Sequence, residues 1–205
     1  MTDIDRKMRS YGLLNLQELD HTIRADIRYA TLDNFTGKIL YVDKFGLYAE
    51  QRLARAICAA NADLSTMKPG HTIVVFDAAR PLHIQKQMFD LVKGTPSERY
   101  IANPYNEVPG GFHNYGMAVD LSICDPEGNL LDMGTPFDSF SELAHVGDER
   151  NMVEKGLLSP DAYANRMFLY SIMGRHGLLP YPFEWWHYQL EQKESDKNRH
   201  PILDF

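Results

Sequence analysis

The sequence of 205 residues contains two cysteines, Cys58 and Cys124. Cys58 falls in a segment with helical periodicity and Cys124 at the end of a strand-like segment, and their spacing indicates no pairing. So few cysteines exclude a disulfide scaffold, because small secreted scaffolds are rich in disulfides. We expect both thiols to be buried and reduced.

The sequence has no apolar run long enough to span a membrane. Its first seven residues also lack the apolar core of a secretory signal peptide. If Met1 is the native start, a cytoplasmic protein is expected. An exported or periplasmic protein whose signal has been removed would begin in the same way, so that alternative stays open.

Positive charge is scarce: 21 Lys and Arg stand against 28 Asp and Glu, a net charge of -7. A nucleic-acid-binding protein needs a basic face, so that class is excluded. Internal repeats and low-complexity tracts are also absent, and the 44% hydrophobic share is ordinary for a globular protein. We therefore expect a single domain over residues 1–205, with the oligomeric state left open.

Periodicity predicts the secondary structure. Apolar stripes and capping residues predict helices over residues 48–64, 81–93 and 159–175. Alternating or β-branched residues predict strands over 20–28, 72–76, 117–123 and 185–190, with a hairpin turn at 125–128 and a long structured loop at 30–46. Because strands and helices do not alternate regularly, the fold class is α+β.

Two segments far apart in the sequence carry metal-binding residue types. His113 and Asp120 belong to the first, and Glu184 and His187 to the second. Two imidazoles and one carboxylate are the ligands of a catalytic zinc that keeps one position open. Glu184 would remain as a general base that takes a proton from water. The spacing differs from the His-Glu-x-x-His helix motif, so a differently built site is expected.

In a β-strand, successive side chains point to opposite faces, so the spacing of the candidate residues in both segments decides whether they can face the same site. His113 lies an odd number of residues before Asp120, so on one regular strand the two side chains would point apart. Gly116 offers a turn that could return His113 to the face of Asp120. Glu184 and His187 also differ in parity, so we expect Glu184 at the bend before the strand and His187 on it.

Each of these residues alone also has a structural explanation. His113 could be a satisfied histidine beside Gly and Tyr, and Asp120 a buried carboxylate at a turn. Trp185 and Trp186 alone would be core residues. The combination favours a metal site, because a generic core seldom requires two histidines and two carboxylates.

Arg80 and Asp138 are further candidates for residues that contact the substrate. Arg80 follows a buried strand, where a guanidinium could stabilise an oxyanion; the alternative is a solvated arginine at the sheet edge. Asp132 and Asp138 lie on a loop shaped by Gly and Pro, which could be solvated or could hold an anionic clamp for a substrate ammonium group.

Several longer motifs resemble one family. The chain is similar to the VanX-type D-alanyl-D-alanine dipeptidases, which belong to the zinc D,D-peptidases related to the hedgehog N-terminal fold. The resemblance covers nearly all of the chain, and its motifs are residues 26–37 with Tyr41, Asp77-Ala-Ala-Arg-Pro81, residues 113–120, Leu131-Asp-Met-Gly-Thr-Pro-Phe-Asp138 and Glu184-Trp-Trp-His187.

The resemblance implies a small, mainly antiparallel sheet flanked by helices. It also implies one zinc ion per chain, with ligands His113, Asp120 and His187. Glu184 would then be the base, Arg80 would steady the tetrahedral intermediate, and Asp138 would bind the substrate ammonium group. Tyr41 and Gly111 are expected to contact the substrate.

The chain departs from the family pattern beside this pocket. Gly111 stands where family members usually carry Ser, with Phe112 next to it, and Ala79 stands where many carry Tyr. The exact dipeptide preference is therefore left open.

The expected activity is zinc-dependent hydrolysis of D-Ala-D-Ala, or a closely related dipeptide, in cell-wall metabolism. One alternative is a zinc D,D- or L,D-carboxypeptidase that acts on longer wall peptides. Another is a non-catalytic zinc-binding domain, as in the hedgehog branch. The presence of Glu184 and Arg80 favours an enzyme with a small dipeptide substrate over the binding domain.

Overall fold

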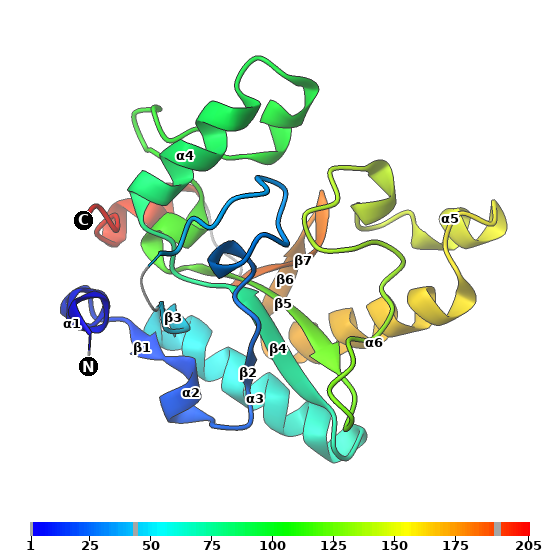
Figure 1. Cartoon of the computed structure of the whole chain (residues 1–205). Coiled ribbons are helices and arrows are strands. Elements are labelled where there is room, and N and C mark those ends of the chain that lie inside the picture. The colour runs from blue at the N-terminus through cyan, green and yellow to red at the C-terminus, as the bar shows by residue number, and fades with distance from the viewer. Residues whose placement is uncertain (1, 43–44, 191–193) are drawn as a thin grey trace.

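A computed structural model of the chain describes residues 2–42, 45–190 and 194–205. Its main sheet has the strand order β2 (Arg24–Ala25), β4 (Thr72–Asp77), β5 (Ala118–Cys124), β7 (Glu184–Leu190) and β6 (Leu178–Tyr181) (Figure 1). β2 runs parallel to β4, and the other neighbouring strands are antiparallel. The predicted α+β fold with a mainly antiparallel sheet flanked by helices is confirmed.

Two long helices cover one face of this sheet. α3 (Gln51–Met67) and α6 (Pro160–Arg175) contact each other, and they also contact β4 and β6 respectively (Figure 1). The predicted apolar stripe of α3 is buried in the main core, together with β5 residues such as Val119 and Leu121. Ser159 caps α6 as predicted, because its side chain accepts a hydrogen bond from the backbone N–H of Ala162.

Shorter elements complete the chain. β1 (Leu14–Asn15) and β3 (Tyr48–Ala49) form a separate antiparallel pair. The remaining α-helices are α1 (Asp3–Ser10), α2 (Leu16–Leu19), α4 (Leu82–Val92) and α5 (Glu149–Glu154). The 3₁₀ helices are η1 (Arg28–Ala30), η2 (Pro96–Tyr100), η3 (Phe112–Tyr115), η4 (Glu142–Ala144) and η5 (Glu194–Arg199). No helix in the described ranges has the length and apolar character needed to cross a membrane.

Two expected element boundaries were wrong, and one strand was not predicted. The helix predicted from residue 48 begins at Gln51, because Tyr48 and Ala49 pair with β1 and the Glu50 carboxylate caps the helix. Residues 20–28 contribute only a two-residue strand to the sheet. β6 was not predicted; it contains Pro180 and lies at the sheet edge, where proline is tolerated.

The register of three adjacent strands places polar residues side by side. Asp120 of β5 lies opposite Asp77 of β4 and opposite His187 of β7. Residues paired across neighbouring strands present their side chains on the same face. An irregularity between Val75 and Asp77 brings Asp77 into this row, and such irregularities are frequent beside functional sites.

The turn expected at Gly116 is present. Gly116 has a φ of 69° and ends η3, which turns the chain between His113 and β5. A Cβ atom at this position would lie 2.7 Å from Leu13 Cδ2, and Leu13 is itself buried. The position therefore favours glycine for both its backbone conformation and its packing.

We predict that Gly116→Ala destabilises the protein more than Gly94→Ala. Both glycines have positive φ, but a Cβ atom at Gly94 would meet nothing within 4 Å. Each substitution should cost about 1–2 kcal/mol of left-handed strain. Gly116→Ala should lower the free energy of unfolding by about 1–3 kcal/mol more through overpacking. Urea unfolding of both variants measures the difference, and equal losses would contradict the packing explanation.

Candidate active site and metal centre

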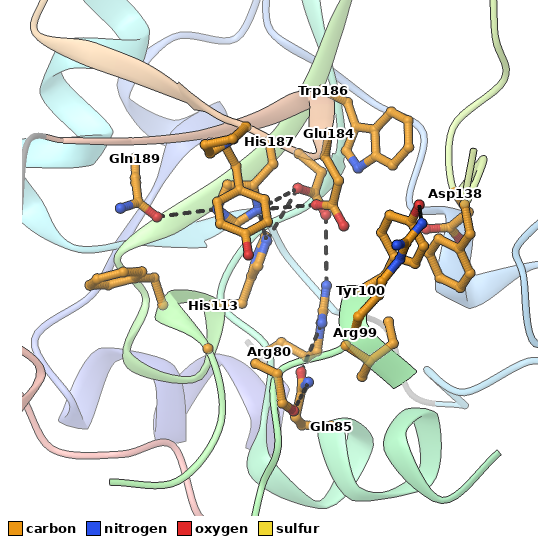
Figure 2. A pocket seen from close by; sticks show the side chains of 18 of the residues that line it. Arg80, Gln85, Arg99, Tyr100, His113, Asp138, Glu184, Trp186, His187 and Gln189 are labelled. Atoms are coloured by element: carbon orange, nitrogen blue, oxygen red, sulfur yellow. Dashed lines mark hydrogen bonds and ion pairs between the residues drawn. The ribbon is translucent and has the colours of Figure 1, made fainter. Parts of the chain in front are cut away.

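A cavity of about 440 Å³ opens where β5, β7 and η3 meet (Figure 2). Seven of the eight residues singled out from the sequence line it: Arg80, Gly111, His113, Asp120, Asp138, Glu184 and His187. Tyr41 is not among the lining residues. Segments distant in the sequence are thus brought to one place by the fold.

The two histidines and Asp120 converge on one another inside this cavity. His113 Nε2 lies 3.1 Å from His187 Nδ1 and 3.2 Å from Asp120 Oδ1, and His187 Nδ1 also lies 3.2 Å from Asp120 Oδ1. Zinc ligands at about 2.0–2.1 Å and tetrahedral angles are separated by about 3.3 Å. All three residues are buried. The group therefore has the spacing required to hold a metal ion.

The second ring nitrogen of each histidine is bonded to an acceptor. His113 Nδ1 lies 2.7 Å from the carbonyl oxygen of Ala78, and His187 Nε2 lies 3.3 Å from Gln189 Oε1. In the neutral rings these nitrogens carry the proton, which leaves lone pairs on His113 Nε2 and His187 Nδ1. Two nitrogen lone pairs and a carboxylate oxygen then face each other in a buried space. A cation satisfies all three, so the residues fit a metal ion.

Electrostatics agree with this arrangement. Burial by itself raises the pKa of Asp120, but the facing His113 and His187 outweigh burial and hold that pKa well below its usual range. Asp120 is therefore ionised and available as a ligand over the physiological pH range.

Glu184 is the first residue of β7 and lies beside the group formed by His113, Asp120 and His187. Its Oε2 is 3.7 Å from His187 Nδ1. An irregular register in the β6–β7 pair, where Tyr181 lies opposite Glu184, accompanies the change of parity before His187. Burial raises the pKa of the Glu184 carboxyl to about 8. A carboxyl group with a pKa near neutrality suits general acid–base catalysis.

Arg80 points into the cavity from the end of β4 (Figure 2). Asp77 Oδ2 accepts hydrogen bonds of 2.7 Å from its Nε and Nη2, and Gln85 Oε1 accepts one of 2.8 Å from Nη1. Nη2 also lies 3.7 Å from Asp120 Oδ2. The guanidinium is thus fixed next to Asp120.

Tyr41 lies behind the cavity wall, next to Asp77 and Arg80. Its hydroxyl donates a 2.7 Å hydrogen bond to Asp77 Oδ1, on the carboxylate that orients Arg80. Burial and the neighbouring Asp77 raise the pKa of Tyr41 well above its usual value, so the hydroxyl remains a donor. Tyr41 does not line the cavity, and its expected contact with the substrate stays a prediction.

Asp138 projects its carboxylate into the cavity from the loop after Pro136. The Tyr29 hydroxyl donates to Oδ1 at 2.9 Å, and the Phe35 backbone N–H donates to Oδ2 at 3.1 Å. Asp138 adopts a φ of 61°, which is uncommon for a residue with a side chain. Burial raises the pKa of its carboxyl to about 7.

Sequence reasoning missed the residues that support these groups. Asp77 stands in the same motif as Arg80, and its spacing of three residues was an available signal. Gln85, Tyr29 and Asn114 gave no local signal. Asn114 is fully buried and donates to the Arg80 carbonyl oxygen at 2.9 Å while it accepts from the Gly111 N–H.

The arrangement defines a class of protein. Three buried side chains that could bind a metal converge in the cavity, a carboxyl group lies next to them, and a fixed guanidinium faces the same space. These are the parts of a metal-dependent hydrolase.

Comparison with known proteins agrees with this class. The D-Ala-D-Ala dipeptidase family matches residues 9–205. The chain is 31% identical to the D-alanyl-D-alanine dipeptidase of Escherichia coli K12 over 192 residues, which cover 93% of this chain and 89% of that protein. It is 32% identical to the enzymes of the same name from Enterococcus faecalis and Streptomyces coelicolor, and each alignment covers 87% of this chain and 91% of the relative. The chain belongs to the D-Ala-D-Ala dipeptidase family.

We predict that His187→Ala abolishes metal binding. The variant removes one of three converging ligands, so bound metal should fall from about one ion per chain to near zero. His176→Ala is the matched control, because His176 pairs with Asp63 outside the cavity. Metal analysis of the dialysed proteins measures the change. Unchanged metal content in His187→Ala would contradict the ligand assignment.

Proposed function

We propose that the protein is a zinc dipeptidase that hydrolyses D-Ala-D-Ala or a closely related dipeptide in cell-wall metabolism. The observation that carries this proposal is the convergence of His113, Asp120 and His187 beside Glu184, in a cavity that also contains the Asp138 carboxylate. The names of the relatives support the choice of substrate.

We propose zinc as the metal, bound once per chain by His113, Asp120 and His187. Two imidazoles and one carboxylate match the donors that catalytic zinc prefers. When bound, zinc would lower the pKa of a water molecule and polarise the scissile carbonyl group.

Glu184 and Arg80 would perform the other steps. Glu184, with a pKa of about 8, would take a proton from the attacking water and transfer it to the leaving amine. Arg80 would stabilise the negative charge that develops on the carbonyl oxygen, and its bonds to Asp77 keep it in position before the substrate binds.

Asp138 would bind the ammonium group of the dipeptide. Its carboxylate is present above a pH of about 7 and is lost as the pH falls through that value. The α-amino group of a peptide has a pKa of about 7.7–8.0, so it loses its charge above that range. Both charges therefore coexist best between pH values of about 7 and 8.

We also propose that residues 1–205 act as one domain. The main sheet joins β2 and β4 from the first half of the chain to β6 and β7 near its end. The cavity likewise takes residues from Tyr29 to Lys197, so neither half contains the whole site.

One assay tests the proposed activity. Zinc-loaded protein should release alanine from D-Ala-D-Ala, but not from L-Ala-L-Ala or from an N-acylated tripeptide that ends in D-Ala-D-Ala. Cleavage of the tripeptide with no cleavage of the free dipeptide would contradict the dipeptidase function and support the carboxypeptidase alternative.

For Glu184→Gln we expect turnover to fall by about 10²–10⁴-fold with zinc still bound, because the amide keeps the size of the carboxylate but accepts no proton. Steady-state kinetics and metal analysis on the same preparation give both quantities. Near-normal turnover in the zinc-loaded variant would rule out the base assignment.

For Asp138→Asn we expect KM for D-Ala-D-Ala to rise about 10-fold or more, since a hydrogen bond between charged groups contributes about 1.5–3 kcal/mol. Wild-type KM should increase as the pH falls below about 7, and the variant should lose this dependence. Asp132→Asn is the matched control, because Asp132 caps Gly134 on the same loop and does not line the cavity. The same pH dependence in wild type and Asp138→Asn would eliminate Asp138 as the ammonium ligand.

A further inference from the structure

Arg99 is a cation at the edge of the active-site cavity to which the proposed reaction assigns no role. It lies near the end of η2, and it lines the cavity although it is an exposed residue. Within residues 2–42, 45–190 and 194–205, no carboxylate forms an ion pair with it. Arg80, by contrast, is bound by Asp77 in the same cavity. Arg99 is therefore the better candidate for binding an anion that enters from outside.

Tyr100 holds the Arg99 side chain in a fixed orientation. The Arg99 Cζ atom lies 4.9 Å from the centroid of the Tyr100 ring, and Nη2 donates a 2.9 Å hydrogen bond to the Tyr100 hydroxyl. A guanidinium that already lies on a ring loses little freedom when it binds a ligand. The bond to Tyr100 uses one of several N–H groups, so the others can bind a carboxylate.

A series of aromatic contacts connects Arg99 with Asp138. The Tyr100 ring stacks on Phe140, with centroids 5.0 Å apart and planes at 3°. The centroid of the Phe140 ring lies 4.9 Å from that of Phe35, whose backbone N–H donates to Asp138 Oδ2. The stack thus keeps the guanidinium and the Asp138 carboxylate in one part of the cavity wall.

This part of the cavity is where the first residue of a dipeptide would lie. Figure 2 shows Arg99 and Asp138 on the same side of Glu184, away from His113. If Asp138 binds the substrate ammonium group, as proposed above, the α-carbon of the first residue lies next to Asp138. The side chain of that residue then begins on the side of the cavity that carries Arg99. A methyl group is too short to leave the ammonium group, but a glutamyl side chain can extend its carboxylate toward Arg99.

The cavity has room for a longer side chain. Its volume of about 440 Å³ falls in the range of about 300–1,000 Å³ that is usual for sites of drug-sized ligands. D-Ala-D-Ala has only methyl side chains. Tyr29, Tyr100 and Phe140 line the same cavity, so the methylene groups of a longer side chain would meet aromatic carbon atoms.

We propose that the substrates include dipeptides whose first residue has an acidic side chain, and that Arg99 binds this carboxylate. The proposal rests on the function proposed above, and it makes Arg99 a specificity-determining residue. It assigns each charge of such a first residue to a separate partner, with Asp138 for the ammonium group and Arg99 for the side-chain carboxylate.

Two dipeptides of equal size test the proposal. D-Glu-D-Ala is compared with D-Gln-D-Ala, which keeps the scissile bond and the ammonium group but has a neutral amide in place of the carboxylate. For the zinc-loaded wild type we expect kcat/KM to be about 2–5-fold higher for the acid, the usual effect of an exposed ion pair. The preference should shrink at about 1 M NaCl because salt screens the pair. Arg99→Met should remove it, and Arg99→Lys should keep part of it.

Arg55→Met is the control, since Arg55 is an exposed residue of α3 and does not line the cavity. It should retain the full preference for the acid. Equal use of acid and amide by the wild type, or an unchanged preference in Arg99→Met, would overturn the proposal. Cleavage of D-Ala-D-Ala with no cleavage of either longer dipeptide would also overturn it and would leave the proposed function intact. A wild type that cleaves none of the three would contradict the proposed function, and this inference with it.

Discussion

The site depends on one constraint, which is that three electron-pair donors are held facing one another in a buried space. The strand register fixes Asp120 between Asp77 and His187, and η3 brings His113 to the same point. The acceptors behind the imidazoles, Ala78 O and Gln189 Oε1, contribute by keeping both rings in the orientation that a metal ion requires.

A second layer of polar residues keeps the charges of the cavity apart. Tyr41 donates to Asp77, and Asp77 holds Arg80 by two of its nitrogens. The guanidinium therefore stays next to Asp120 instead of turning toward solvent. The negative charges of Glu184 and Asp138 are less compensated than that of Asp120. Burial raises the pKa of the Glu184 carboxyl to about 8 and that of the Asp138 carboxyl to about 7. Carboxyl groups in one cavity thus differ in protonation, and the proposed roles of ligand, base and ammonium partner follow these differences.

Much of the architecture could be predicted from local patterns. The apolar stripe of α3, the Ser159 cap and the β-branched run of β4 are local signals, and all three elements are present. The ends of elements were less predictable. Tyr48 and Ala49 have a suitable composition for a helix, but pairing with β1 decides their conformation. β6 had no clear signal in the sequence, and its edge position accommodates Pro180.

For the site, the residue types could be read from the sequence, because two histidines, an aspartate and a spare glutamate in two short motifs favour metal-assisted catalysis. The sequence also determined that Gly116 would turn the chain before β5. Which residues share the cavity followed from the tertiary fold. It placed Tyr41 behind Asp77, Tyr29 against Asp138, and Lys197 in the wall beside Gly110. The reason is physical: these contacts join residues far apart in the chain, and strand register and side-chain packing, which have no local signature, create them.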